Sequence, residues 1–575
     1  SSKSLSAVSQ LAASGSTGND TLENTGRLFG NVPLGGGNTR LLNREGASFV
    51  AASDIQLRTD PAASGEFRNE GVLFMGLSAP LLPLNLAAGE QFANVDGVAP
   101  ARDNLLFGSR VITQTNLAGD FIQSASGHMV FDVAFGPYAS DQIRATGSAI
   151  VDGTMDVTMT WLENADSHVL VSTGPGGTAQ DLGLEVTDTL AMDYRILATS
   201  RGIELDFTSH FDQSYLTPNG QAIGKHMNSA IEAGGSGGVG RLTGWLANLK
   251  AGDEGIFTDL MTQISPEAYL TANKIHYLGA DRFRRSMAAS STATRGEWGW
   301  WGSFEHTSFD QASKPDQYAA DSTGYTMAMG SSGDIGSDLI LGLGLGYRRI
   351  DSFAVTDGTL TTGNGDAFHL GGLLAWRPQP GIELTGSVSA GWQWLHSTRL
   401  TNVFQVANVQ AKPKASDVQF ALGGSYTHQF GGGFLKPSFE LTGTALHQAE
   451  FAEKGLEGLG MKSDAHTQWL WTANPRLTAG VTLQERAASH AEFRLTVGGM
   501  FQLEQTMAMP YRFIGANPAA DPAMLTLGLN QNAVMVGGEF VLSHHDRVSL
   551  SAGLNYLGGD RDKTLTGSAK LKIKF

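Results

Sequence analysis

The chain has 575 residues, of which 73 are glycine and none is cysteine, and 16% charged residues give a formal net charge of −16. This length exceeds that of one ordinary domain, and a hydrophobic content of 41% excludes a disordered composition. The acidic balance argues against nucleic acid as a partner, and no run of about 20 apolar residues marks a membrane-spanning helix. The chain opens at Ser1-Ser2-Lys3 without Met, so we expect a processed or truncated product.

The N-terminal part contains short strand-like segments that end in corners containing Asn and Gly. Asn24, Asn43, Asn69 and Asn94 occupy four such corners at intervals of 19, 26 and 25 residues. Such intervals are typical of a right-handed parallel β-helix, in which Asn stacks from coil to coil and Gly makes the tight turns. A jelly roll also has irregular Asn-Gly turns and stays an alternative. We expect β-helix coils over residues 1–118.

The following segment, 119–216, is expected to close this solenoid. A solenoid must be capped, because the unpaired backbone at its open end would otherwise pair with other chains. Strand-like runs suited to a cap occur at 121–123, 129–135, 140–149 and 153–157.

Short amphipathic helices are predicted over 217–264. Three groups of apolar residues recur at helical spacing. They are Ile223, Met227 and Ile231; Leu242, Trp245, Leu246 and Leu249; and Ile256, Phe257, Leu260, Met261 and Ile264. The Gly-x-Ser-x-Gly match at 234–238 follows no apolar strand, so we interpret it as a flexible joint and not as a nucleophile elbow.

A long polar helix is expected over 265–295. Ser265-Pro266-Glu267 provides a capping Ser, a Pro at the first helical position and an acid in the first turn. At about 1.5 Å per residue, the run that follows exceeds the ~30 Å core of a bilayer. Its polar side chains exclude contact with lipid, so it is either a helix inside a polar lumen or a surface helix on a soluble domain. These side chains are Asn273, Lys274, His276, Asp281, Arg282, Arg284 and Arg285.

From residue 296 onward, the chain breaks into roughly twelve alternating segments of about ten residues or more. Leu343 and Leu345, for example, share one face, with Gly344 and Gly346 on the other. Short connections such as 431–433 and long ones such as 398–416 and 506–523 are typical of outer-membrane barrels. A soluble sandwich also alternates, but it does not turn its most apolar face outward on nearly every strand. We therefore predict a 12-stranded antiparallel outer-membrane β-barrel over 296–575.

A barrel of about twelve strands is too narrow for an open porin channel but wide enough to hold one helix. The expected wall of its lumen includes Asp417, Glu440, Glu492 and Arg494, and we expect the arginines of the helix to meet Glu440, Glu492 or Asp417. Amphipathic rings favour the level of the lipid headgroups. We expect this location for the tryptophans at strand ends, namely Trp298, Trp300, Trp301, Trp392, Trp394, Trp469 and Trp471.

The chain ends in Lys570-Leu571-Lys572-Ile573-Lys574-Phe575, in which apolar and charged residues alternate up to a terminal aromatic. A strand of this kind closes an outer-membrane barrel, and we expect Leu571, Ile573 and Phe575 to form its assembly signal. The alternative is an edge strand of a soluble sheet.

The order of solenoid, cap, helical linker, lumen helix, barrel and terminal Phe575 resembles a classical monomeric autotransporter of the type V secretion class. The resemblance covers residues 119–575 and is carried by 140–157, Thr217-Pro218-Asn219-Gly220-Gln221-Ala222, 260–269 and Phe575. It implies an N-terminal passenger displayed on the surface of a Gram-negative cell, an outer-membrane barrel and a helix that seals the lumen. It also implies outer-membrane lipid and lipopolysaccharide, the barrel-assembly machinery and periplasmic chaperones as partners.

Two positions depart from the family pattern. Lys570 stands five residues before the terminal aromatic, where the family usually has Gly. Some members cut their passenger between paired asparagines on the helix, but here Asn273 is followed by Lys274. Asn273 is thus a weak scissile candidate, with Glu440 or Asp417 as helpers.

We therefore expect no enzyme activity, no cofactor and no metal site. The alternatives are a surface enzyme or adhesin whose active part lies upstream of Ser1, and a passive outer-membrane channel.

Overall fold

The computed structural model describes residues 12–75, 112–292, 298–357, 359–403, 407–456, 458–486, 489–545 and 547–575. The chain forms two compact units. The first comprises 1–214, 224–258 and 515–521, and the second comprises 215–223, 259–514 and 522–575. Asn94, predicted to occupy a solenoid corner, lies outside the described residues.

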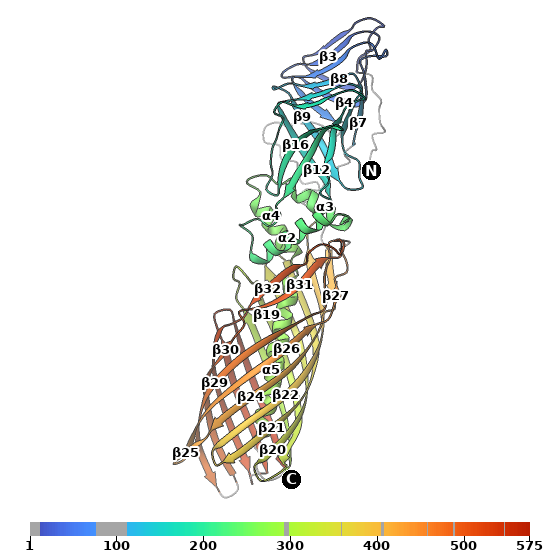
Figure 1. Cartoon of the computed structure of the whole chain (residues 1–575). Coiled ribbons are helices and arrows are strands. Elements are labelled where there is room, and N and C mark those ends of the chain that lie inside the picture. The colour runs from blue at the N-terminus through green and yellow to red at the C-terminus, as the bar shows by residue number, and fades with distance from the viewer. Residues whose placement is uncertain are drawn as a thin grey trace, which may run out of the picture. The chain divides into compact units, whose positions relative to one another are not determined.

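Parallel stacking of short strands defines the first unit (Figure 1). One sheet has the order β1-β3-β5-β8-β11-β14, and a second sheet joins β15-β12-β9-β6-β4 to β7-β10-β13, with β2 beside β4. Strands of successive coils pair in parallel, as in a β-helix. The strands are β1 (Thr21–Asn24), β2 (Arg27–Pro33), β3 (Thr39–Asn43), β4 (Ser48–Gln56), β5 (Gly65–Asn69), β6 (Val72–Met75), β7 (Gln114–Ala118), β8 (Asp120–Gln123), β9 (His128–Phe135), β10 (Gln142–Ala145), β11 (Ala149–Val151), β12 (Thr154–Leu162), β13 (His168–Ser172), β14 (Ala179–Asp181), β15 (Glu185–Val186), β16 (Met192–Thr199) and β17 (Gly202–Ser209).

Buried amides tie successive coils together at one corner. Asn24 Nδ2 donates to Asn43 Oδ1 at 2.8 Å, and Asn43 Nδ2 donates to Asn69 Oδ1 at 2.6 Å. Asn69 Nδ2 in turn donates to Gln123 Oε1 at 2.6 Å. The predicted stacking is confirmed for these three asparagines, and a Gln, which has the same amide group, continues the row.

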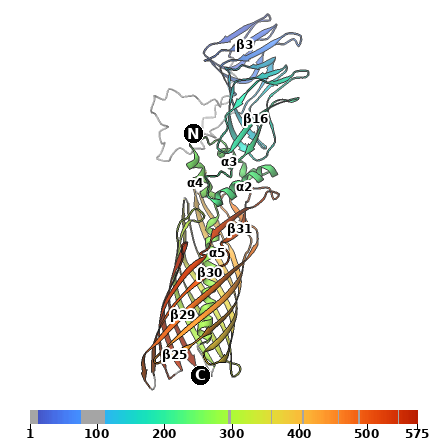
Figure 2. The ribbon, with the colours of Figure 1, turned by 60° about the vertical axis from the view of Figure 1, so that its left-hand side comes forward.

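The helices described are α2 (Pro218–Ala233), α3 (Gly237–Leu246), α4 (Glu254–Ile264) and α5 (Glu267–Thr292). Within the described residues, no helix combines the length and the apolar character needed to cross a membrane. In views 60° apart, α5 runs through the inside of the barrel strands (Figures 1 and 2).

The C-terminal end of the solenoid is covered by a hairpin and by the linker. β16 and β17 pair antiparallel, and β17 also pairs with β13. Next to α3, Asn248 accepts a hydrogen bond from the Met159 N–H at 2.8 Å and donates to the Met159 carbonyl at 2.7 Å. An amide side chain carries the same donor and acceptor as a peptide group, so Asn248 replaces a neighbouring strand at this edge of β12.

Twelve antiparallel strands close a barrel in the second unit, as predicted. Each strand pairs with its neighbours in chain order, and the last strand, β35, pairs with the first, β18. The barrel strands are β18 (Gly299–Gln311), β19 (Ala319–Asp334), β20 (Leu339–Asp357), β21 (Thr359–Gln379), β22 (Ile382–Thr401), β24 (Lys414–Tyr426), β26 (Gly433–Gln448), β29 (His466–Arg486), β30 (Ser489–Gln502), β33 (Asn532–His544), β34 (Val548–Gly558) and β35 (Asp562–Lys574).

Shorter strands accompany the barrel. β23 (Ala407–Ala411) pairs with β22, and β25 (His428–Phe430) pairs with β26. A separate four-stranded sheet contains β27 (Phe451–Ala452), β28 (Met461–Ser463), β31 (Thr506–Phe513) and β32 (Ala523–Gly528). The sequence predicts a long connection over 506–523, but part of it forms β31, because Met507, Met509 and Tyr511 bury alternate side chains there.

Alternation along each strand separates an apolar exterior from a small or polar interior. Leu343 and Leu345 are exposed, whereas a Cβ added to Gly346 would lie 2.6 Å from the ring of Phe283 on α5. Trp298 and Trp300 are exposed, as expected, but Trp301 exposes only 3% of its surface. Its ring points into the barrel because successive side chains of a strand face opposite sides, which corrects the expectation that it lies at the headgroups.

Candidate functional site: the lumen helix and the barrel wall

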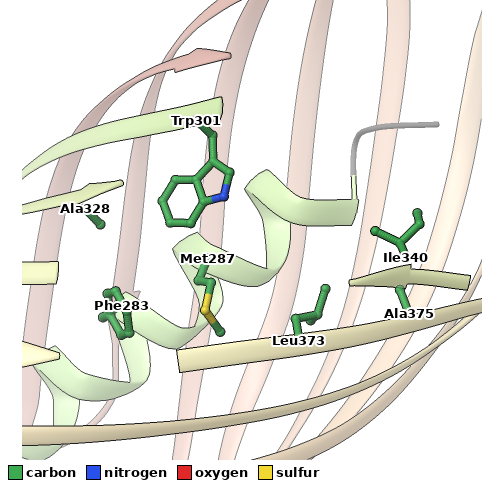
Figure 3. Close-up of a cluster of buried hydrophobic side chains, with 7 residues drawn as sticks. All are labelled: Phe283, Met287, Trp301, Ala328, Ile340, Leu373 and Ala375. Carbon is green, nitrogen blue, oxygen red and sulfur yellow. The ribbon is translucent and has the colours of Figure 1, made fainter. Parts of the chain in front are cut away.

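Helix α5 is enclosed by the barrel. Phe283 and Met287 pack with Trp301 and with Ala328, Ile340, Leu373 and Ala375 of the wall in a buried apolar cluster (Figure 3). Polar side chains of the same helix are also buried, including Asn273, Lys274, His276, Asp281 and Arg284. Because burying an unpaired charge is costly, the wall has to supply partners for these groups.

Arg284 makes a two-pronged ion pair with Glu440 of β26. Its Nη1 lies 2.8 Å from Glu440 Oε2, and its Nη2 lies 2.8 Å from Oε1. Arg284 Nη2 also donates to Asp281 Oδ1 on the same helix at 2.9 Å, and Arg476 of β29 approaches Glu440 Oε1 at 3.3 Å. Parallel hydrogen bonds of this kind hold a guanidinium in a defined orientation. The predicted wall residue Glu440 thus contacts the helix through one of the three arginines.

The neighbouring arginines have other partners. Arg282 Nη1 donates to Thr307 Oγ1 of β18 at 2.5 Å. Arg285 pairs with Asp281 one turn earlier, and its Nη2 lies 3.8 Å from the sulfur of Met500. Positions next to or two residues from Arg284 point to other sides of a helix, since each residue turns it by about 100°. The three arginines therefore face different parts of the barrel.

Two side chains nearer the start of α5 lie against wall carboxylates. Lys274 Nζ lies 2.6 Å from Asp562 Oδ2 of β35. His276 Nε2 lies 3.0 Å from Asp417 Oδ1 of β24. Asp417, predicted on the wall, thus contacts a histidine of the helix. The sequence analysis missed Asp562, although it lies on the same alternating face of β35 as Lys570 and Lys572.

The other predicted wall residues pair with each other. Glu492 and Arg494, both on β30, form an ion pair, and Arg494 Nη1 lies 3.6 Å from Glu539 Oε2 of β33. Lys570 approaches the other oxygen of Glu539 at 3.8 Å. These residues form a patch of the wall in which acidic and basic side chains pair with each other and not with the helix.

A second enclosed cluster holds the beginning of α5. Tyr269 donates its hydroxyl to Glu453 Oε1 at 2.8 Å, and Arg399 Nη2 lies 2.6 Å from Glu453 Oε2. Arg399 Nη1 also donates to the carbonyl of Gln263 at the end of α4. Sequence reasoning missed Glu453 because it lies in the connection between β27 and β28, where no periodic pattern marks it.

The weak scissile candidate Asn273 is held by its side-chain amide. Its Nδ2 donates to Gln448 Oε1 at 2.7 Å and lies 3.0 Å from the sulfur of Met509. The two carboxylates named as helpers are engaged elsewhere, Asp417 with His276 and Glu440 with Arg284.

The terminal strand has one face toward the outside and one toward the helix. Leu571, Ile573 and Phe575, the expected assembly signal, are exposed. On the opposite face, Lys572 Nζ donates to the carbonyl of Ser290 in the last turn of α5 at 2.7 Å. The negative end of the helix dipole stabilises a positive charge at this position.

Solved structures that resemble the chain include three autotransporter parts. The translocator domain of NalP from Neisseria meningitidis is 15% identical, with 54% of this chain and 100% of that chain covered and a TM-score of 0.45. The β-domain of Bordetella BrkA is 16% identical over 49% and 100% of the two chains, with a TM-score of 0.37. The transport unit of AIDA-I from Escherichia coli is 10% identical over 52% and 98%, with a TM-score of 0.35.

A search of curated proteins found no match. The family model of the autotransporter β-domain, however, matches residues 300–556, which comprise nearly all of the barrel. The resemblance found in the sequence is thereby confirmed, and the barrel is a translocator that is not itself catalytic. Residues 300–556 are thus an autotransporter β-domain, and the barrel to which they belong is a translocator in the outer membrane of a Gram-negative cell.

Proposed function

We propose that this chain exports its own N-terminal solenoid to the cell surface and displays it there, while α5 stays in the barrel and seals the lumen. The observation that carries this proposal is the enclosed, two-pronged pair of Arg284 with Glu440, both N–O distances being 2.8 Å. A chain segment that only passes through a pore does not need wall residues that pair with its charged side chains. The further contacts of Lys274 and His276 with Asp562 and Asp417 also favour a permanent resident of the lumen.

We further propose that the displayed segment stays covalently attached. Cleavage after Asn273 would need its side-chain nitrogen to attack its own backbone carbonyl carbon while a nearby base takes a proton, but this nitrogen donates a hydrogen bond to Gln448 and lies 3.0 Å from the sulfur of Met509. Asp417 lies 3.0 Å from His276 and Glu440 pairs with Arg284, both on the same helix. We propose no enzymatic activity for the displayed segment itself.

We propose one role for each successive segment of the chain. Residues 1–118 are passenger coils, 119–216 cap them and support their folding, 217–264 form the linker, 265–295 the pore helix and 296–575 the barrel. The parallel coils and the edge contact of Asn248 with Met159 support the first two assignments. The exposed apolar residues of the terminal strand fit recognition by the barrel-assembly machinery, namely Leu571, Ile573 and Phe575.

The remaining partners in this proposal are periplasmic chaperones before insertion, then phospholipid and lipopolysaccharide around the exposed apolar face. The barrel acts as a monomer, because its first and last strands pair with each other and leave no open edge in the described residues.

Cell fractionation with surface proteolysis tests display and retention together. We expect a heat-modifiable band in the outer membrane that still carries the solenoid after boiling, and removal of the solenoid by protease added to intact cells. Protection of the solenoid in intact cells would contradict display. Retention of the solenoid would be contradicted by a separate barrel-sized fragment that forms in cells without added protease and is missing in cells that carry Asn273→Ala.

A further inference from the structure

One face of α5 follows the seam at which the last barrel strand, β35, meets the first strand, β18. The residues of this face are Lys274, Arg282, Ser286 and Ser290. At about 100° per residue, steps of eight, four and four residues keep each member within about 80° of the next, so they form one stripe that winds slowly along the helix. Each of them contacts β18, β35 or both.

Lys274 contacts both strands at once. Gln311 of β18 and Asp562 of β35 are directly opposite in the register of the seam. Lys274 Nζ lies 2.6 Å from Asp562 Oδ2 and donates to Gln311 Oε1 at 3.2 Å. Because Lys274 exposes only 2% of its surface, water screens this bridge little.

A second cross-seam pair lies further along the helix. Thr307 of β18 and Thr566 of β35 are opposite in register, and their hydroxyls are 3.4 Å apart. Arg282 Nη1 donates to the Thr307 hydroxyl at 2.5 Å. The helix therefore binds one member of a pair whose other member already bonds across the seam.

The last two contacts divide between the strands. Ser286 Oγ donates to Ser303 Oγ of β18 at 3.3 Å. Lys572 Nζ of β35 donates to the carbonyl of Ser290 at 2.7 Å. The helix thus touches both strands along most of their paired length, from Gln311↔Asp562 to Trp301↔Lys572.

The seam differs from the other strand pairs of the barrel. Every other neighbouring pair of barrel strands that the structure describes is consecutive along the chain, whereas β18 and β35 lie at its two ends. Their pairing therefore depends on the backbone ladder and on side chains, without a connecting segment that keeps the strands close. An opened seam would expose two strand edges to other chains.

We propose that this face of α5 is a staple that holds the β18–β35 seam closed, with Lys274 as its main positioning residue. The inference concerns closure of the barrel, and it does not depend on whether the helix also seals the pore.

The test uses the full chain purified in detergent and the rate at which the folded band converts to the unfolded band on heating in SDS. Lys274→Met removes the bridge, and we expect unfolding at a fixed temperature to accelerate about tenfold or more, because a buried carboxylate loses its partner. A disulfide across the seam, Ser308→Cys with Leu565→Cys, joins residues that are opposite in register. We expect it to restore the slow rate in the Lys274→Met background. The native chain has no cysteine that would compete.

The matched control is a disulfide across a pair far from the seam, Leu441→Cys with Ala473→Cys, which are opposite in register on β26 and β29. We expect no rescue from it. Equal rescue by both disulfides, or an unchanged unfolding rate in Lys274→Met, would overturn the proposal. Should Lys274→Met fail to fold, Lys274→Gln keeps a hydrogen-bond donor, removes the charge and permits the same comparison. Conductance of the oxidised barrel reports separately on sealing, so the two proposals can fail independently.

Discussion

Arg399 Nη2 and Glu453 Oε2 lie 2.6 Å apart, although their side chains expose only 1% and 0% of their surface. Arg399 Nε also donates to Glu453 Oε1 at 3.1 Å, and the Tyr269 hydroxyl and the Met461 N–H donate to the two carboxylate oxygens, each at 2.8 Å. Each oxygen therefore accepts two hydrogen bonds. This cluster joins α5, β22 and the small sheet at the end of the barrel where α5 begins.

Removing one member of this pair is expected to destabilise the barrel strongly. Glu453→Ala leaves the guanidinium of Arg399 buried without its partner, which costs about 3–5 kcal/mol. The double variant Arg399→Met with Glu453→Leu is expected to recover part of the loss, because it removes both charges. Heat-modifiable mobility of the purified barrel measures the effect, with Glu450→Ala at an exposed position as the control. Equal stability of Glu453→Ala and the control would refute the assignment.

The seal proposed for α5 predicts a change in conductance. Replacing Arg282, Arg284 and Arg285 with Ala removes the Arg284–Glu440 bridge and three bulky side chains from the lumen. We expect ion conductance in planar bilayers to rise and the extracted barrel to become more sensitive to detergent. Arg349→Ala serves as the control, since Arg349 pairs with Asp366 away from the helix. Unchanged conductance of the triple variant would refute the seal.

The row of amides in the solenoid predicts a stability effect at Asn43. This buried side chain accepts a hydrogen bond from Asn24 and donates one to Asn69, so Asn43→Ala leaves polar groups on two coils without a partner. We expect a loss of about 1–3 kcal/mol. Thermal unfolding followed by circular dichroism measures it, and the exposed Asn116→Ala is the matched control. A loss no larger than that of the control would argue against a stabilising row.

The solenoid cap is predicted to weaken in acid through Glu204. Burial raises the pKa of Glu204, but hydrogen bonds from Ser167, Thr199 and Arg201 outweigh burial and leave this pKa below its usual value. A carboxylate with a depressed pKa adds stability above its unfolded-state pKa of about 4.3. That stability is lost as pH falls through the lower pKa of the folded state.

Glu204→Gln lacks this titration. We expect its unfolding midpoint to be below that of the native chain at pH 7 and the difference to shrink toward pH 3. The comparison with Glu185→Gln, at an exposed position, isolates the contribution of the hydrogen bonds that Glu204 accepts. A difference that is constant between pH 7 and pH 3 would contradict the linkage.

The amino-acid sequence is sufficient to predict the types of secondary structure and the two faces of the barrel strands. Alternation of Leu343 and Leu345 with Gly344 and Gly346 predicts outside and inside correctly, because a strand has only two faces. The spacing of Asn24, Asn43 and Asn69 predicts their stacking for a similar reason, since each coil returns to the same corner. The long helix begins at Glu267, next to the predicted Pro266, because a Pro and an acid at a helix start act without any distant residue. Ser265, predicted as the cap, leaves its hydroxyl without a hydrogen-bond partner in the described part of the chain.

Which residues meet across the lumen depends on the closed barrel and cannot be read from the sequence. Period-two alternation places Asp417 and Asp562 on the wall without giving their height or their position around the barrel, since both depend on the tilt and stagger of the strands. Polar residues surround α5 on several sides, so its sequence leaves its rotation open. Closure of the barrel sets the positions of the wall residues and the rotation of α5. For this reason His276 meets Asp417, while Lys274 meets Asp562, a residue almost 300 positions away.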